Sequence, residues 1–217
     1  MSRLTWRIGR LVEVRSETAT ARTLVLDVPG WSAHLPGQHV DVRLTAPDGY
    51  SAQRSYSIAS APDGTRVELT VQRVADGEVS PYLVDVLSVG DPVELRGPIG
   101  GWFVWRPGAP EPVTLIAGGS GIAPLMAMVR TRHAASSAVP FRLLYSVRSV
   151  EDVLYADELR RRGRDDGGLD VTYLYTRRAP DGVARPAGRI GLADVNRHAW
   201  PAAFEPAAFV CGPTGFV

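Results

Sequence analysis

The chain has 217 residues, with 24 Lys and Arg against 23 Asp and Glu, and a formal net charge of +1. This balance excludes the broad positive field that draws proteins to nucleic acid, so we expect no nucleic-acid partner. The length allows two domains of about a hundred residues each. The sequence has no apolar run near the roughly 18 residues of a membrane-spanning helix, and residues 1–7 lack the apolar core of a signal peptide. We therefore expect a soluble, cytoplasmic protein.

Residues that bind metals are scarce. Cys211 is the single cysteine, which excludes an internal disulfide and a cysteine-ligated iron–sulfur cluster held by this chain alone. The four histidines lack the spacing of metal ligands. We expect no metal site, and any iron–sulfur cluster must lie on another chain.

The first half of the chain is a series of short alternating segments separated by turn signals such as Pro47-Asp48-Gly49. The segments are residues 10–15, 22–28, 39–44, 53–58, 66–73 and 92–96. Their pattern predicts an antiparallel β-barrel or sandwich. Residues 79–87 break the pattern with apolar side chains at helical spacing, which predicts one helix over a mouth of the barrel.

After the proline-rich residues 107–112 the pattern changes. Continuous apolar runs now alternate with helical stretches, which predicts an α/β domain with a parallel sheet. The runs are residues 113–117, 141–147, 171–175 and 207–211, and the helical stretches are residues 124–133 and 153–162. We therefore expect two domains, a barrel over residues 1–108 and an α/β domain over residues 109–217.

The segment Arg54-Ser55-Tyr56-Ser57 lies in an expected strand and carries groups suited to a flavin dinucleotide. Because side chains alternate along a strand, Arg54 and Tyr56 project on one face. Arg54 is suited to charge-assisted contact with phosphate, and Tyr56 to packing on the flavin ring or ribityl chain. Ser57 is left to hydrogen-bond the ring edge near its reactive N5. The alternative is an amphipathic barrel strand with an exposed arginine.

The segment Gly118-Gly119-Ser120-Gly121 follows the first expected parallel strand and precedes Pro124, which suits the first turn of a helix. Gly119 and Gly121 permit a tight turn whose backbone N–H groups, beside Ser120, can approach a pyrophosphate. Pro124 stands where the third glycine of the dinucleotide fingerprint belongs, so the motif is a different one. The alternative is a turn that binds nothing.

These segments, followed by Cys211-Gly212-Pro213, make the chain resemble the ferredoxin–NADP reductase superfamily, whose flavin strand has the pattern Arg-x-Tyr-Ser and whose glycine turn has the pattern Gly-Gly-[Ser/Thr]-Gly-Ile-Ala-Pro. The resemblance continues through residues 35–38, 77–80 and 97–100 and covers nearly the whole chain. It implies a flavin held by one domain and reduced by a nicotinamide dinucleotide held by the next.

The resemblance also implies how the flavin is held. In the family a Gly-x-x-Ser segment gives backbone amides and a hydroxyl to the FAD pyrophosphate at a helix start. The matching residues are Gly77, Val79 and Ser80, and their presence favours FAD over FMN. On the residues alone, Ser80 is equally well an ordinary N-terminal helix residue.

Three arginines predict a preference for NADPH over NADH. Arg148 follows the second expected parallel strand, where a carboxylate would favour NAD, and Arg177 follows the third. Arg189 lies in Gly188-Arg189-Ile190, and NADP-preferring relatives carry phosphate-binding arginines at such positions. The alternative is that all three are solvated loop arginines.

Cys211-Gly212-Pro213 closes the fourth expected parallel strand, where open α/β sheets place ligands. The resemblance implies that Cys211 lies beside the nicotinamide, while a buried, inert side chain is the alternative. No histidine or second cysteine stands beside Cys211 in sequence, so we do not expect a nucleophile. Relatives continue through a further helix and strand whose terminal aromatic often covers the flavin. The resemblance therefore implies a chain truncated at its C-terminus or an unusually open site.

The predicted function is an oxidoreductase that passes a hydride from NADPH to FAD and then single electrons to a separate carrier protein. Tyr56, Ser57 and Cys211 are the residues expected beside the reacting atoms. Two alternatives stay open: a flavin reductase or diaphorase, and a flavin-binding module without turnover. The oligomeric state is open, with a monomer expected.

Overall fold

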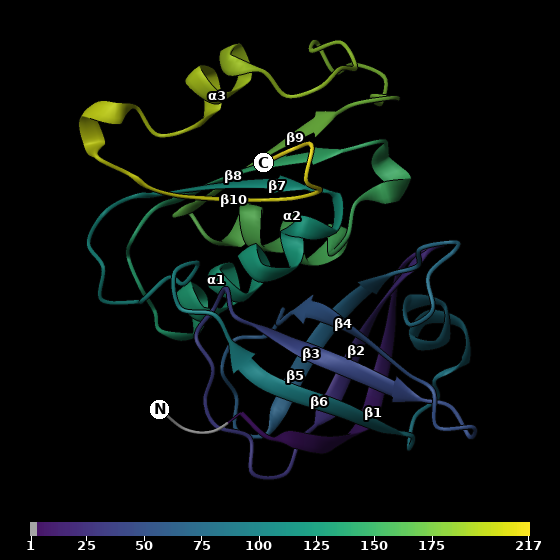
Figure 1. Cartoon of the computed structure of the whole chain (residues 1–217). Helices are drawn as coiled ribbons and strands as arrows, with labels where there is room; N and C mark the ends of the chain where they lie inside the picture. Colours follow the sequence, from purple (N-terminus) through teal and green to yellow (C-terminus); the bar gives the residue numbers. More distant parts are fainter. Residues whose placement is uncertain (1–3) are drawn as a thin grey trace.

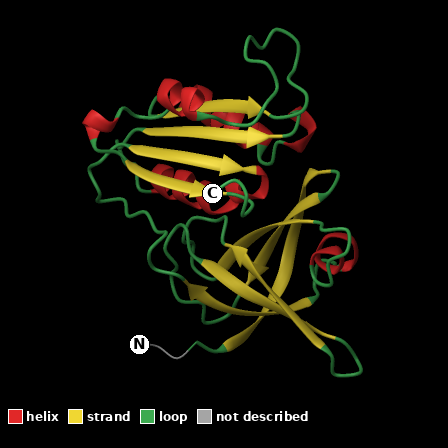
Figure 2. Ribbon diagram, turned by 45° about the horizontal axis from the view of Figure 1, so that its top comes forward, coloured by secondary structure: helices red, strands yellow, loops and turns green. Residues whose placement is uncertain are grey.

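The computed structural model describes residues 4–217. Figure 1 shows an antiparallel domain below and a parallel-sheet domain above. Figure 2 shows the same two domains from a view in which the top of the molecule comes forward. The antiparallel domain contains β1 (Trp6–Thr18), β2 (Ala21–Asp27), β3 (His39–Thr45), β4 (Ser51–Ser57), β5 (Arg66–Gln72) and β6 (Pro92–Ile99). Their order in the sheet is β4-β3-β6-β1-β2-β5. The expected barrel is confirmed.

The sheet curls so that one face is buried. Val40 and Val42 on β3 and Leu24 and Leu26 on β2 have exposed fractions of at most 1% and belong to one apolar core. β4 and β5 form the two edges of the sheet, and the isolated bridge from Ile58 to Leu69 joins them. Most of β4 thus keeps an unpaired edge, which leaves room for a ligand along this strand.

The helix expected over residues 79–87 is present over residues 80–86. Ser80 and Pro81 are helical and lead into the π-helical turn η1 (Tyr82–Val86). Pro81 has no N–H to donate, and the turn ends at Leu87 in an extended conformation. Leu83 and Val84 are buried in the barrel core, as the apolar spacing predicted.

The second domain has a parallel sheet in the order β10-β7-β8-β9. Its strands are β7 (Val113–Gly118), β8 (Phe141–Val147), β9 (Leu169–Tyr175) and β10 (Ala207–Cys211). Its helices are α1 (Ile122–Ala134), α2 (Ala156–Asp165) and α3 (Leu192–His198). Short 3₁₀ turns are η2 (Gly119–Gly121), η3 (Val150–Asp152) and η4 (Ala202–Phe204). The four predicted strands are confirmed. The sequence interpretation missed α3.

Helix α1 lies between the parallel sheet and the barrel (Figure 1). Its residues from Ile122 to Val129 are all buried, because one side packs on the sheet and the other side meets the barrel. This explains why α1 has no polar face along these turns. Within residues 4–217, no helix is long and apolar enough to cross a membrane.

Candidate active site

A groove runs along the carboxyl edge of the parallel sheet. Its deeper part encloses about 340 Å³ and is lined by the residues that follow β7, β8, β9 and β10, together with Gln72 at the end of β5. Its outer part encloses about 500 Å³ and shares Ser146, Thr176 and Pro213 with the deeper part. The groove therefore lies where the two domains meet and where open α/β sheets hold their ligands.

The glycine turn forms one wall of this groove. Gly119 has a φ of +52°, and a Cβ there would meet nothing within 4 Å, so the position favours glycine for its backbone conformation. A Cβ on Gly121 would lie 2.3 Å from the carbonyl oxygen of Cys211, so glycine is required for close packing against the end of β10. Ser120 between them is exposed. The turn presents backbone and a free hydroxyl to the groove, as a pyrophosphate requires.

The three predicted arginines meet in the outer groove. Arg148, Arg177 and Arg189 all line the 500 Å³ hollow, although they come from three separate loops. Within residues 4–217, Arg177 and Arg189 are exposed and have no ion-pair partner. Arg148 instead pairs with Asp152 at 2.5 Å. The sequence interpretation did not predict this pair, which forms because η3 folds Asp152 back toward the end of β8.

Phe216 is a groove residue that the sequence interpretation missed. A Cβ on Gly212 would lie 2.6 Å from its ring, and a Cβ on Gly118 would lie 2.9 Å from it. The ring therefore packs flat against two glycines at the ends of β10 and β7. No local sequence signal marks this residue, because its contact with Gly118 depends on the pairing of β10 with β7.

Cys211 ends β10 beside the glycine turn. Burial raises the pKa of its thiol, with a smaller opposing effect from the backbone N–H of Gly212. The thiol is therefore neutral near pH 7 and is a poor nucleophile. It offers a small, uncharged side chain at the sheet edge.

The barrel side of the candidate site centres on β4. Directly paired residues of antiparallel strands share a face, so Arg54 and Tyr56 lie on the face of Val42 and Val40. Tyr56 is half-buried against the barrel core, and burial raises the pKa of its phenol to about 12, so it stays neutral. Ser57 pairs with His39 of β3 at the end of the strand.

The contacts that hold Arg54 lie on the protein surface. Its guanidinium donates to the Gln53 carbonyl at 2.7 Å and to the Glu78 carboxylate at 3.0 Å. Tyr50, which the sequence interpretation missed, donates to the same carboxylate at 2.7 Å. Both side chains of the Arg54–Glu78 pair are about half exposed (53% and 50%). Such a pair contributes little to stability, so a phosphate can replace Glu78 as the partner of Arg54.

Residues 77–80 form a tight turn beside Arg54. A Cβ on Gly77 would lie 3.0 Å from the Ser80 hydroxyl, and that hydroxyl accepts a hydrogen bond from the Val74 N–H at 3.0 Å. The Val79 side chain is buried in the barrel core. Gly77 and Val79 can thus offer a ligand only their backbone, and Ser80 can offer only its remaining O–H.

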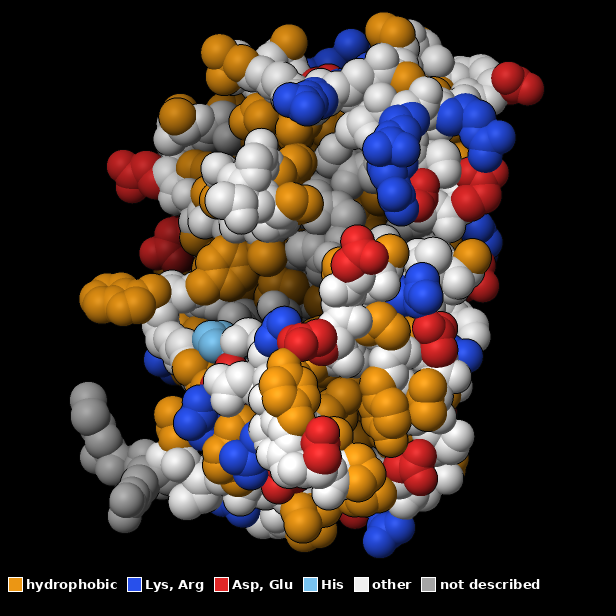
Figure 3. All heavy atoms as spheres, turned by 45° about the vertical axis from the view of Figure 1, so that its right-hand side comes forward, with side chains coloured by type: hydrophobic (Ala, Val, Ile, Leu, Met, Phe, Trp, Pro, Cys, Tyr) orange, Lys and Arg blue, Asp and Glu red, His pale blue; other side chains and the backbone are white. Residues whose placement is uncertain are grey.

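A hollow of about 750 Å³ adjoins this turn and is lined by Tyr50, Glu78 and Tyr82 together with apolar residues of β1, β3 and β6. Figure 3 shows hydrophobic side chains gathered on the barrel half of this face. An exposed cation, a half-buried phenol and an adjoining apolar hollow suit the phosphate, ring and adenosine parts of FAD. The donors present on the barrel therefore fit this cofactor.

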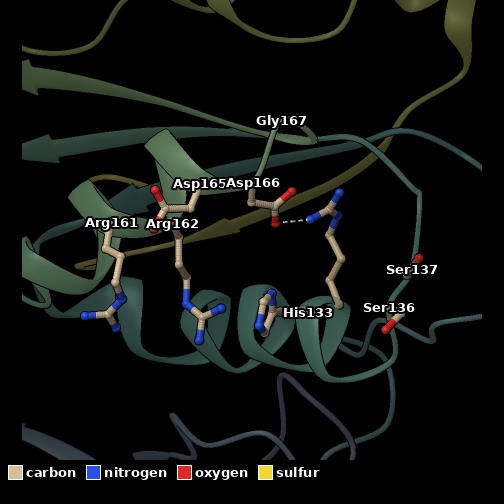
Figure 4. Close-up of a pocket in the computed structure, with 9 residues that line it drawn as sticks. His133, Ser136, Ser137, Arg161, Arg162, Asp165, Asp166 and Gly167 are labelled. Carbon is tan, nitrogen blue, oxygen red and sulfur yellow. Dashed lines mark hydrogen bonds and ion pairs between the residues drawn. The ribbon is translucent and has the colours of Figure 1, made fainter.

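Another hollow, of about 550 Å³, lies at the opposite edge of the parallel sheet. Figure 4 shows it between α1 and α2, with His133, Arg161 and Arg162 around it. Arg132 pairs there with Asp166. The lining residues precede β8 and β9, so they lie at the amino ends of the strands, away from the groove. This hollow is not part of the candidate site.

Comparison with known proteins agrees with the two-domain division. Residues 9–104 match the family described as oxidoreductase FAD-binding domain, and residues 115–217 match the oxidoreductase NAD-binding domain. The chain is 35% identical over 210 residues to ferredoxin–NADP reductase B of Sorangium cellulosum, a match that covers 94% of this chain and 85% of that protein.

Two further comparisons show the range of relatives. The chain is 35% identical over 158 residues to methane monooxygenase component C of Methylosinus trichosporium, covering 73% of this chain and 43% of that protein. The crystal structure of the FAD/NAD-binding domain of nitric oxide dioxygenase from Vibrio cholerae superposes with a TM-score of 0.83 at 27% identity, covering 97% of this chain and 88% of that one. Several other curated relatives are about twice as long as the segment matched here. The chain belongs to the ferredoxin–NADP reductase superfamily of FAD- and NAD(P)-dependent oxidoreductases.

Proposed function

We propose that this chain passes a hydride from NADPH to FAD and then electrons to a separate carrier protein. The observation that carries the proposal is the groove at the carboxyl edge, which brings the glycine turn, three arginines and Pro213 together beside Gln72 of the barrel. Relatives named as a ferredoxin reductase and as a methane monooxygenase component support a carrier protein as the acceptor. A division at residues 108/109 and a cytoplasmic location stay predictions.

On the barrel, this proposal gives β4 the task of holding FAD, which supplies the hydride-accepting and electron-donating chemistry when bound. Arg54 binds the pyrophosphate in place of Glu78, and residues 77–80 add backbone donors and the Ser80 hydroxyl. Tyr56 packs its neutral ring on the flavin, since its raised pKa keeps the phenol uncharged. Ser57 donates its hydroxyl to the ring edge.

In the groove, the chain's residues orient NADPH. Gly119, Ser120 and Gly121 face the pyrophosphate, and the three arginines converge on the 2′-phosphate of the adenosine ribose. Cys211 and Gly212 leave a neutral, narrow surface for the nicotinamide, with the thiol protonated. Rate enhancement would then come from orientation, because hydride transfer requires the reacting atoms to approach to about 3–3.5 Å.

The test is an anaerobic titration of the purified protein followed by its visible absorption spectrum. The protein is expected to purify yellow with non-covalent FAD, and NADPH is expected to bleach the flavin absorption. Addition of an oxidised ferredoxin or flavodoxin should then restore it faster than free flavin or quinone does. Faster oxidation by free flavin or quinone would instead identify a diaphorase. Bound flavin that NADPH leaves oxidised would refute the proposal.

A further inference from the structure

Tyr155 adopts a backbone conformation that a bulky residue rarely takes. It lies just before α2 with φ of +56° and ψ of 30°, in the left-handed region. For an L-residue with a large side chain this conformation is energetically unfavourable. Its exposed fraction is only 4%, so the surrounding contacts must hold it there. These contacts therefore fix the position of Tyr155 at the start of α2.

The contacts form a closed ring of hydrogen bonds. The Tyr155 N–H donates to one oxygen of the Glu17 carboxylate at 2.9 Å, and the Tyr155 phenol donates to the Thr70 hydroxyl. Thr70 and Thr23 hydroxyls lie 2.7 Å apart, and Thr23 donates to the other Glu17 oxygen at 2.6 Å. An ionised carboxylate can only accept, so the chain of donors runs from Tyr155 through Thr70 and Thr23 to Glu17.

This ring joins the two domains. Glu17, Thr23 and Thr70 belong to β1, β2 and β5 of the barrel, whereas Tyr155 belongs to the parallel-sheet domain. Burial raises the pKa of the Tyr155 phenol, which keeps it a neutral donor. Hydrogen bonds aligned in one direction and ending on a charge strengthen one another in a buried setting. The ring is therefore a joint between the barrel and the parallel-sheet domain, and its hydrogen-bond donors are all directed toward Glu17.

An arginine reinforces the joint. Arg130 of α1 is only 10% exposed, and it pairs with Glu68 of β5 at 2.8 Å and with Glu158 of α2 at 2.6 Å. It also donates to the Ala59 carbonyl of the barrel at 2.9 Å. Its guanidinium lies 5.1 Å from the centre of the Tyr155 ring. Two independent sets of contacts thus converge on the same point of the domain interface.

The joint is continuous with the groove at both of its ends. Residues 148–155 run directly from the end of β8 to Tyr155, and Arg148, Asp152 and Leu154 of this segment line the groove. On the barrel side, β5 carries Thr70 into the ring and Gln72 into the groove wall. A shift of Tyr155 relative to Thr70 would therefore move one groove wall against the other.

We propose that Tyr155 is a positioning residue for hydride transfer, because its ring with Thr70, Thr23 and Glu17 fixes the nicotinamide groove relative to the flavin domain. The inference rests on the proposed function. The four residues of the ring do not line the groove, so they would act through the distance between the two reacting atoms. A misplacement of about 1 Å can reduce a rate by about 100-fold without weakening binding.

The sharpest variant is Thr70→Val, which keeps the shape of the side chain and removes the hydroxyl that links Tyr155 to Thr23. Thr70→Ser restores the hydroxyl and is the matched rescue. Tyr173→Phe removes a half-buried phenol that lies outside both the ring and the groove, and it serves as the control. Rapid mixing with NADPH would give the limiting rate constant of flavin reduction and the apparent dissociation constant of NADPH. Small-angle X-ray scattering of the purified proteins would give the domain arrangement without any turnover.

Thr70→Val is expected to lower the limiting rate constant at least 10-fold and to change the NADPH dissociation constant less than 3-fold. It is also expected to broaden the distribution of interatomic distances obtained from the scattering profile. Thr70→Ser and Tyr173→Phe should resemble the unmodified protein in all three measurements. An unchanged rate constant in Thr70→Val, with the unmodified protein reduced normally, would overturn the positioning role alone. Failure of NADPH to reduce the unmodified protein would overturn the proposed function and this role together. A fall in rate that Thr70→Ser does not rescue would also overturn it.

Discussion

In the barrel, the groups predicted to hold FAD are side chains on an edge strand, whereas in the parallel sheet the groups predicted to hold NADPH lie on glycine turns at strand ends. Arg54 is half exposed and pairs with an equally exposed Glu78. Gly121 instead packs its backbone directly against Cys211, with no room for a Cβ. The barrel site is thus built from replaceable surface contacts, and the groove is built into the fold of the sheet.

Because the groove is built into the fold of the sheet, we expect the largest loss of stability from a substitution at Gly121. In Gly121→Ala the new Cβ would lie 2.3 Å from the Cys211 carbonyl oxygen, so the glycine turn and the end of β10 must move apart. We expect a loss of about 3 kcal/mol in unfolding free energy, measured by urea titration, together with loss of flavin reduction by NADPH. Gly167→Ala is the control, because a Cβ there meets nothing within 4 Å. Equal stability of the two variants would show that the groove wall is not rigid.

The interface between the two regions should be sensitive to acid. Burial opposes ionisation of Glu158, but the hydrogen bonds and charges of Arg130 and Arg162 outweigh it and lower the pKa of its carboxyl to about 2. The stabilisation is therefore complete above pH 4.5, the ordinary value, and is lost as the pH falls toward 2. We expect Glu158 to account for about 2 kcal/mol of the loss in unfolding free energy between pH 6 and pH 3.

The measurement is urea unfolding at both pH values for the unmodified protein and for Glu158→Gln, which should show a smaller pH dependence. Glu151→Gln is the matched control. The pKa of Glu151 is also lowered to about 2, first by a hydrogen bond from Ser149, but its side chain is exposed and solvent screens its pair with Arg178. If Glu151→Gln reduced the pH dependence as much as Glu158→Gln, surface charges would dominate the acid response.

On the barrel side, Arg54→Ala should weaken FAD without destabilising the fold. Loss of a charge-assisted hydrogen bond costs about 2 kcal/mol, or roughly 30-fold in the FAD dissociation constant measured by fluorescence titration. The melting temperature of the flavin-free protein should change little, because the Arg54–Glu78 pair is exposed. Arg73→Ala removes a similar exposed pair with Asp85 and should leave FAD affinity unchanged. Equal FAD affinity in Arg54→Ala and the unmodified protein would remove β4 from the flavin site.

The smallest effect is expected from the outer groove. The double variant Arg148→Ala/Arg177→Ala should raise the KM for NADPH about 10-fold while kcat stays nearly constant, because these contacts are remote from the reacting atoms. Steady-state rates with NADPH and NADH would measure the lost preference. Arg178→Ala, an adjacent exposed arginine paired with Glu151, is the control. A KM for NADH that rises equally would mean that the arginines do not bind the 2′-phosphate.

The sequence predicted the elements whose patterns are local. Alternating and continuous apolar runs located the ten strands of residues 4–217, and the strand–turn–helix around Gly119 followed from the glycines and Pro124. The sequence could not predict contacts between distant segments. Asp152 reaches Arg148 because η3 turns the chain back, and Tyr50 reaches Glu78 across the gap between two loops. The α3 helix was missed because its few turns carry no fully buried residue and so lack an apolar stripe.

Two other features of the site could not be predicted from the sequence pattern, because contacts between residues far apart in the chain produce them. The left-handed backbone of Tyr155 is imposed by Glu17, which lies 138 positions away in the chain. Phe216 lies on Gly118 only because β10 and β7 are neighbours in the sheet. Local propensity alone would place neither side chain, since both are fixed by tertiary packing.

The central claim is that one chain orients NADPH against FAD so that hydride passes directly between them. The most direct measurement is the rate of flavin reduction by NADPH carrying deuterium at one or the other face of nicotinamide C4. The account predicts a primary isotope effect with one of the two labelled forms and none with the other, because a fixed groove presents a single face to the flavin. Equal rates with both forms and with unlabelled NADPH would contradict direct transfer as the step that the groove controls.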